Sequence, residues 1–265
     1  MPLFGPNIKK MKEKRDIRGL INALRNAPPQ IRVEAIEALI DIDDPKVLEL
    51  LLKEFSDVFR FGEEADKVEA ITIIRACPTR QSLGAMTHSD SLGLILTSDS
   101  FTKIWKYEKV KFTKKLNLGL VRPILLEVAM NSGENLVIRW YTVTALAELG
   151  DRSDELVQLL INILDAMPKQ NLFIVEESLR ILSYFTGNPT ARNVLMNSLR
   201  TGTVSRMYSI YALGALGDPL TRENLEYLVV HGDKNDRKRA EIALNLFGTA
   251  SYDEIKAKCE KETKI

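Results

Sequence analysis

The sequence predicts an all-α fold, a right-handed α-solenoid superhelix of about seven stacked helical pairs. Three observations lead to this prediction. A short pattern recurs along the chain, a second amphipathic stretch precedes most copies of it, and helix-ending and helix-starting residues separate the units. Apolar residues make up 45% of the 265 residues, which is ordinary for a globular chain and excludes a disordered or collagen-like one.

The recurring pattern is clearest in Ile31–Leu39 and Ser205–Leu213. Successive copies are 31 to 36 residues apart, except for one interval of 72 residues, which leaves room for a hidden copy. The fifth position of each copy is small, so that a neighbouring helix can approach, and larger apolar residues share its helical face. The copies begin at Ile31, Asp66, Ile138, Ile174, Ser205 and Asp236.

Each copy is expected to be the second helix of a pair. The first helices are predicted within residues 47–55, 118–130, 156–167, 191–199 and 225–230. Between units, a glycine just past one helix is followed by an Asx N-cap and often by proline. The clearest examples are Gly150–Asp151, Gly187–Pro189 and Gly217–Pro219. Such a pair cannot bury its apolar face alone, so neighbouring pairs must stack.

The pattern Ile/Val-Arg-x-x-Ala-x-x-Ala-Leu-x-x-x-Gly-Asp resembles the second helix of HEAT repeats, particularly the short class named after phycobiliprotein lyases. The resemblance extends over residues 16–248, with 78–117 as the weak stretch. It implies a solenoid whose second helices line the concave surface. It also favours a scaffold or adaptor, because the family consists mostly of such proteins.

A single HEAT-like repeat domain is expected over residues 1–265. Residues 1–15 are predicted to be a tail or lead-in helix, 16–77 and 118–250 regular repeats, and 251–265 a polar capping helix. Cys259 in this last helix is expected to be an exposed, inert thiol. Residues 78–117 are interpreted as a degenerate helical repeat, which the missing interval favours, or as a β-hairpin insertion.

Charge balance and cysteine content indicate which partners and which cellular compartment to expect. The 37 basic and 36 acidic residues nearly cancel, although acids dominate from Glu34 to Asp66 and bases from Lys103 to Arg122, so the surface is expected to be dipolar. Two cysteines are too few for a disulfide framework. No signal peptide or membrane-spanning stretch is found. We therefore expect a cytoplasmic protein without a membrane partner, and we favour a monomer.

Catalytic motifs are missing from the sequence. It has no glycine-rich phosphate loop, no G-x-S-x-G, no H-E-x-x-H and no C-x-x-C, and its two histidines, His88 and His231, lie far apart. We therefore expect neither catalysis nor a metal or other cofactor. The bases at the second repeat position are expected to bond acids or carbonyls at neighbouring turns, with Asp151 and Asp218 as candidate partners, or alternatively to bind phosphate. They are Arg32, Lys67, Arg139, Arg206 and Arg237.

The candidate partner-binding residues occupy the second helices. Their residue types are enriched in interface cores, although aromatic residues at these positions are equally suited to packing between repeats. A protein partner on the concave face is the main prediction, and the residues proposed to contact it are Trp140, Tyr141, Arg180, Met207, Tyr208, Tyr211 and Arg239.

Two alternatives remain open. The segment 101–122 interleaves lysines with aromatic residues, as in surfaces that bind single-stranded nucleic acid. The candidate residues there are Lys103, Trp105, Lys106, Tyr107, Lys109, Lys111, Lys114 and Lys115. The second alternative, implied by the resemblance alone, is a lyase-type subunit acting on a bilin chromophore.

Overall fold

The computed structural model describes residues 6–28, 31, 34–35, 38–39, 41–42, 45–75, 118–167 and 172–263. Every regular element within these ranges is a helix, and none of them contains a strand, which confirms the all-α prediction for this part of the chain. The segment 78–117, for which a helical repeat and a β-hairpin are both considered, lies outside the described residues.

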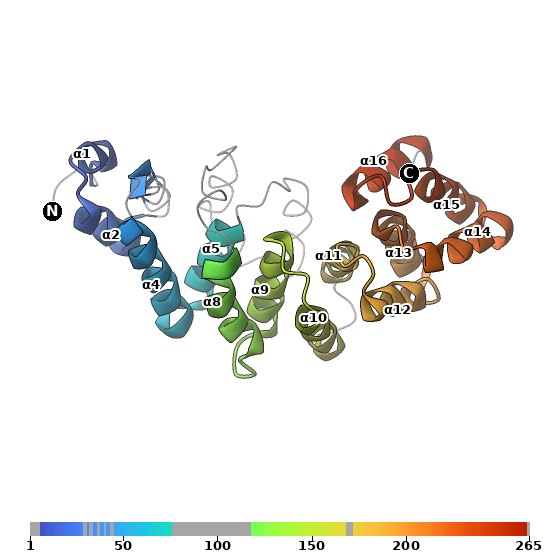
Figure 1. Cartoon of the computed structure of the whole chain (residues 1–265), viewed down its shortest axis with the longest axis horizontal. Helices are drawn as coiled ribbons and strands as arrows, with labels where there is room; N and C mark the ends of the chain where they lie inside the picture. Colours follow the sequence, from blue (N-terminus) through green and yellow to red (C-terminus); the bar gives the residue numbers. More distant parts are fainter. Residues whose placement is uncertain are drawn as a thin grey trace. The chain divides into compact units, whose positions relative to one another are not determined.

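The chain divides into two compact units, Met1–Leu149 and Gly150–Ile265. The boundary falls inside the stretch 118–250 that the sequence presents as continuous repeats. The helices of unit 1 are α1 (Ile8–Glu13), α2 (Ile17–Asn26), α4 (Pro45–Phe61), α5 (Glu64–Arg75), α8 (Leu118–Met130) and α9 (Leu136–Glu148) (Figure 1). Those of unit 2 are α10 (Asp154–Ala166), α11 (Leu172–Leu182), α12 (Pro189–Ser198), α13 (Thr203–Leu216), η3 (Pro219–Thr221), α14 (Arg222–His231), α15 (Lys234–Asn245) and α16 (Tyr252–Thr263).

Within each unit the helices form two layers. Consecutive helices pack in pairs, such as α8 with α9, α12 with α13 and α14 with α15. The first helices α4 and α8 contact each other in unit 1, as do the second helices α5 and α9. In unit 2, α10 contacts α12, and α11, α13 and α15 contact one another in succession. The second helices of each unit therefore form one layer, which positions the residues considered below.

The small fifth position of the repeat is buried in every copy. Ala35, Ala70 and Ala240 have at most a few per cent of their surface exposed, and the polar members of the set are buried too. Thr142 donates its hydroxyl hydrogen to the carbonyl of Ile138 at 2.7 Å, and Ser209 makes the equivalent bond four residues back. A buried hydroxyl satisfied in this way adds little volume and leaves no orphan polar atom, so neighbouring helices can approach.

The predicted stop-and-start sequences are confirmed, with one difference. Gly150, Gly187 and Gly217 all have positive φ, which glycine adopts at little cost. Asn188 caps α12 by accepting from the Ala191 amide. For α10, however, the N-cap is Ser153 rather than Asp151. The Asp151 carboxylate accepts from the Ser153 amide at 2.9 Å, so it forms a turn ahead of the helix instead of capping it.

The connection from α15 to α16 is fixed against α13 by two glycines. Gly217 and Gly248 both have positive φ, and a Cβ added at Gly217 would lie 2.4 Å from the Cα of Gly248. The Gly248 amide donates to the carbonyl of Gly214 at 2.9 Å. Because the two backbones touch here, the chain leaving α15 is held at the end of α13, and α16 starts from that point.

A reciprocal capping box starts α16. The Ser251 hydroxyl accepts from the Glu254 amide, and the Glu254 carboxylate accepts from the Ser251 amide at 2.8 Å. The hydrogen bond from that amide lowers the pKa of Glu254. Within the segment 251–265 the chain is helical from Tyr252 to Thr263.

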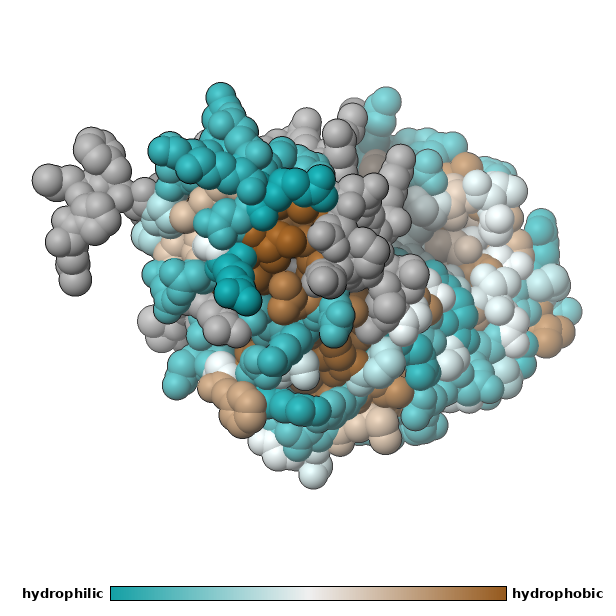
Figure 2. Space-filling model, turned by 60° about the vertical axis from the view of Figure 1, so that its left-hand side comes forward, coloured by the Kyte–Doolittle hydropathy of each residue, from teal (hydrophilic) through white to brown (hydrophobic). Residues whose placement is uncertain are grey.

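On the near part of the face drawn in Figure 2, hydrophilic residues cover most of the surface, and hydrophobic ones are visible mainly in recesses between them. None of the helices within the described ranges combines the length and the apolar character needed to span a membrane.

Candidate functional site

The structure places the two candidate residues of unit 1 in its interior. Trp140 in α9 has no exposed surface, and the neighbouring Tyr141 is buried as well. Their rings meet edge to face with centroids 5.0 Å apart. This placement favours the alternative that aromatic residues of α9 pack between helices, with the rings stabilised by burial and by their mutual geometry.

The candidates of unit 2 lie on its layer of second helices and are mostly buried. Arg180 in α11, Tyr211 in α13 and Arg239 in α15 have 4%, 2% and 5% of their surface exposed. Met207 and Tyr208 in α13 are half-buried. The helix that covers this layer is α16, which contacts both α13 and α15 (Figure 1). We call the part of the layer made by Glu176, Arg180, Tyr208, Tyr211 and Arg239 the covered face.

One side of α16 supplies the contacts with the covered face. The side chains of Tyr252, Ile255 and Cys259 are buried, and their spacing of three and four residues puts them on one helical side. The Tyr252 ring meets that of Tyr211 edge to face, with centroids 5.9 Å apart. The interface is therefore apolar and aromatic at its centre.

Lys256 joins α16 to α11 and α13. Its ammonium group forms an ion pair with Glu176 of α11 and lies 5.8 Å from the centre of the Tyr208 ring. The Tyr208 side chain also hydrogen-bonds Glu176. Because Lys256 and Glu176 are both more than two thirds buried, this pair is screened less by water than a surface pair.

A buried ion pair stands at the α11 end of the covered face. The Arg180 Nε donates to Glu177 Oε2 at 2.8 Å, and the guanidinium makes further hydrogen bonds to Glu177 and to the Tyr184 hydroxyl. Both charged side chains are 5% exposed. An ion pair this deeply buried is tolerated only when its hydrogen bonds are well satisfied, which these contacts achieve.

A second buried carboxylate, Asp236 in the first turn of α15, accepts from two arginines. Arg206 of α13 donates from 3.3 Å and Arg239 from 3.4 Å. Two buried polar atoms at the covered face have no hydrogen-bond partner within the described part of the chain, namely Arg239 Nε and the hydroxyl of Tyr252. Each such atom loses its hydration without compensation, which costs about 1–3 kcal/mol.

Burial perturbs the titration of this region. Burial raises the pKa of the Cys259 thiol to about 12 and that of Tyr211 to about 12. It raises the pKa of Tyr252 further, and the carboxylate of Glu176 adds to that shift. Burial also raises the pKa of Asp253 above its usual range, an effect that the charge of Arg180 partly opposes. At neutral pH, α16 thus presents a neutral thiol and a neutral phenol to the covered face, where the phenol of Tyr211 is neutral as well.

The expected exposure of Cys259 is wrong. The side chain has no exposed surface because α16 docks through it rather than lying free as a polar cap. With its pKa raised by burial, the thiol holds its proton at neutral pH and is a poor nucleophile.

The basic residues at the second repeat position are structural where the structure describes their bonds. Arg139 Nε donates to the carbonyl of Ala129 at 2.9 Å, and Arg206 Nε donates to that of Leu199 at 2.9 Å. In both cases the carbonyl lies at the end of the preceding helix, where cations are favoured. This confirms the expected bonding to neighbouring turns for Arg139 and Arg206, while Arg32 lies outside the described residues.

Two of these bases also bond acids that belong to a later helical pair. Arg206 bonds Asp236, thirty residues further along, and Lys67 bonds an acid in the loop before α9. The suggested partner Asp218 is instead bound by Arg192 of α12 at 2.9 Å.

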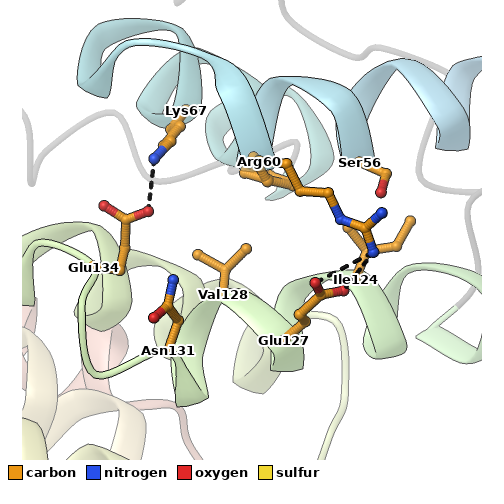
Figure 3. A pocket seen from close by; sticks show the side chains of 9 residues that line it. Ser56, Arg60, Lys67, Ile124, Glu127, Val128, Asn131 and Glu134 are labelled. Atoms are coloured by element: carbon orange, nitrogen blue, oxygen red, sulfur yellow. Dashed lines mark hydrogen bonds and ion pairs between the residues drawn. The ribbon is translucent and has the colours of Figure 1, made fainter.

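Unit 1 contains a pocket of about 190 Å³ between α4, α5 and α8 (Figure 3). Two ion pairs cross it. Arg60 bonds Glu127 at 3.2 Å, and Lys67 bonds Glu134 at 2.7 Å, while Asn131 lies on the wall between the two acids. Because both cations are already paired with carboxylates, the pocket offers no net charge to attract an ionic ligand.

All eight candidate nucleic-acid residues, from Lys103 to Lys115, lie outside the described residues. Within the described ranges, no group of three or more His, Cys, Asp or Glu side chains is arranged to hold a metal ion.

One residue of the covered face and the residues of α16 that contact it are not among the candidates predicted from the sequence. Glu176 in α11 and Tyr252, Ile255 and Lys256 in α16 were assigned no role. Two signals were present in the sequence. Ser251 and Glu254 have the spacing of a capping box, and the apolar residues after Ser251 recur at helical spacing.

Comparison with known proteins adds no assignment. No protein-family model matches the chain, and neither a curated protein nor a solved structure matches it.

Proposed function

We propose that the chain is a non-enzymatic adaptor of the HEAT-repeat type, a right-handed solenoid of about seven helical pairs that binds another protein through its second helices. The two lone cysteines favour the reducing cytoplasm as its location. The partner surface includes the covered face of unit 2.

One observation carries the proposal. In unit 2 the layer of second helices accommodates an amphipathic helix, α16, by contacts of the kind that protein partners use. Tyr211 packs against an aromatic ring, Tyr208 lies beside an ammonium group, and Glu176 forms an ion pair. Aromatic anchors surrounded by polar contacts are typical of helix-binding surfaces.

The bonding of the repeat bases supports the same proposal. Arg139 and Arg206 donate their Nε hydrogens to helix-end carbonyls, and Arg206 also pairs with Asp236. These arginines act within and between helical pairs, so they do not form a basic row available to phosphates. The proposal therefore places recognition on the aromatic and acidic residues.

The test is affinity capture from native cytosol at about 0.15 M salt, with and without nuclease, followed by mass spectrometry. The wild-type chain is compared with a Tyr208→Ala/Glu176→Lys double variant. The matched control is Tyr227→Ala, which removes an aromatic side chain that is 63% exposed on α14. Circular dichroism first establishes that all three chains are folded.

A protein that survives nuclease, binds the control and is lost with the double variant supports the proposal. Loss of every partner on nuclease treatment shifts the function to nucleic acid and to Lys103–Lys115. A partner that the double variant retains and the Tyr227→Ala chain loses contradicts the assignment of the covered face, because recognition then lies on α14.

A further inference from the structure

We propose that α16 is a displaceable internal ligand of the covered face, and that the protein partner binds by inserting an amphipathic helix of the same pattern in its place. This inference rests on the proposed function, since it names the class of partner and the regulation of the same surface. Its basis is the way in which α16 is seated.

The position of α16 is that of a ligand on a row of helices. In unit 2, a first helix such as α12 packs against α13 and α10. In contrast, α16 contacts the second helices α13 and α15 and reaches a third, α11, through Lys256 and Glu176. It lies over the layer instead of extending it. A helix bound in this way occupies the surface that a partner helix needs.

The fit of α16 is incomplete at two atoms. The hydroxyl of Tyr252 and the Nε of Arg239 are buried at this interface without a hydrogen-bond partner within the described residues. Cys259, a weak acceptor, is buried on the side of α16 that packs against α13 and α15, the helix that carries Arg239, and the two groups interact electrostatically. A helix that placed a stronger acceptor at this position would satisfy Arg239 and bind more tightly than α16 does.

These contacts define the pattern expected of the partner helix. It has an aromatic residue at the position of Tyr252, an aliphatic residue at Ile255, a base at Lys256 to pair with Glu176, and an amide or carboxylate acceptor at Cys259. The first three features reproduce contacts that α16 makes, and the fourth offers a strong acceptor to Arg239 Nε, which has no hydrogen-bond partner within the described residues.

The connection before α16 suits displacement of this helix alone. The bond from Gly248 to Gly214 and the close contact of Gly248 with Gly217 hold the chain to α13 up to this residue. Thr249 and Ala250 follow before the capping box of Ser251. Release of α16 can therefore pivot after Gly248 while the packing of α13 and α15 is kept.

The first experiment measures the opening of α16 in the full-length chain by alkylation of Cys259, followed by peptide mass mapping so that Cys77 is counted separately. Lys256→Glu places a carboxylate beside Glu176 and is expected to raise the alkylation rate about tenfold. The matched control is Lys238→Glu, because Lys238 pairs with Glu262 of α16 in an exposed salt bridge and its reversal is expected to change the rate less than twofold.

The second experiment measures binding of labelled peptides with the sequence of residues 251–263 to the full-length chain. A Cys259→Gln peptide is expected to bind about tenfold more tightly than a Cys259→Val peptide, and both are expected to bind the Lys256→Glu chain more tightly than the wild type. A Glu176→Lys chain repels its own Lys256 and that of the peptide alike. In that chain a peptide carrying Lys256→Glu is expected to bind more tightly than one that keeps Lys256, which fixes the register.

The outcomes separate the two proposals. Equal Cys259 alkylation in the Lys256→Glu, Lys238→Glu and wild-type chains, or failure of both peptides to bind the Lys256→Glu chain, overturns the role of α16. A captured protein partner that binds wild-type and Lys256→Glu chains equally also overturns it while leaving the adaptor function intact. Peptide exchange without any protein partner supports the displacement of α16 and leaves the adaptor proposal to fail on its own test.

Discussion

Removing the hydroxyl of Tyr252 is expected to stabilise unit 2, although most substitutions of buried residues destabilise. The residue is 2% exposed, and its hydroxyl has no hydrogen-bond partner within the described ranges. An unsatisfied buried hydroxyl costs about 1–3 kcal/mol. Tyr252→Phe removes that cost and leaves the ring against Tyr211. Part of the gain is lost because the oxygen leaves a small void, so a net stabilisation of about 1 kcal/mol is expected.

Tyr211→Phe is the matched comparison, with the opposite expected sign. Its hydroxyl accepts a hydrogen bond from the guanidinium of Arg239, and bonds to charged groups contribute about 1.5–3 kcal/mol. Loss of this bond leaves the buried guanidinium with one partner fewer, so a destabilisation of about 1.5 kcal/mol is expected.

The assay is urea unfolding of both variants, followed by amide hydrogen exchange in α13 and α16 so that the signal belongs to unit 2. The reasoning is refuted if Tyr252→Phe lowers the free energy of unfolding by more than about 0.5 kcal/mol, because the hydroxyl must then have a bonding partner. It is also refuted if the two variants shift stability in the same direction by the same amount.

Three further predictions concern the same layer of helices. Gly214→Ala is expected to destabilise the fold by about 1–3 kcal/mol despite the better helix propensity of alanine, because the new methyl group would lie 2.9 Å from the Cβ of Ala243 in α15. Thermal melting that showed stabilisation would contradict this. Stability is expected to fall as pH rises from about 9 to about 12, because Cys259 and Tyr211 keep their protons in the folded chain while they ionise in the unfolded chain. Urea midpoints across that range measure this fall, which is expected to be shallower in Tyr211→Phe. Arg206→Met is expected to lower the free energy of unfolding by about 2–4 kcal/mol, because it leaves the Leu199 carbonyl without this donor and the buried Asp236 carboxylate with one arginine fewer. A loss below about 1 kcal/mol in urea unfolding would show that neither bond contributes to stability.

Features with a local cause are the ones that the sequence predicts best. Glycine with positive φ at 150, 187 and 217 and the cap at Asn188 depend on a few adjacent residues. The small fifth position of the repeat is equally predictable, because a helix that packs between two others needs it wherever the pattern occurs. Even here Asp151 was assigned a cap that Ser153 provides, since two capping residues two positions apart compete for the same helix start.

Features that depend on tertiary docking could not be predicted in the same way. Cys259 looks exposed because its neighbours along the chain are charged, and only the docking of α16 buries it. Arg180 looks like an exposed interface residue until Glu177 and Tyr184 are seen to satisfy it in the interior. The i, i+3 spacing of Glu177 and Arg180 was visible in the sequence, but that spacing is as common on exposed helix faces as in buried pairs.

The residue types that favour a binding surface and those that favour packing between helices are the same, so composition alone could not separate the two interpretations at Tyr208 and Tyr211. The structure gives a physical reason why both can hold in unit 2. Tyr211 is buried because a helix lies on it, and that helix belongs to the chain itself. Whether such a surface acts as packing or as a binding site depends on the difference in affinity between the internal helix and an external one. That difference is set at a few positions, Lys256 opposite Glu176 and Cys259 near Arg239, where substitution changes the internal helix and leaves the covered face as it is.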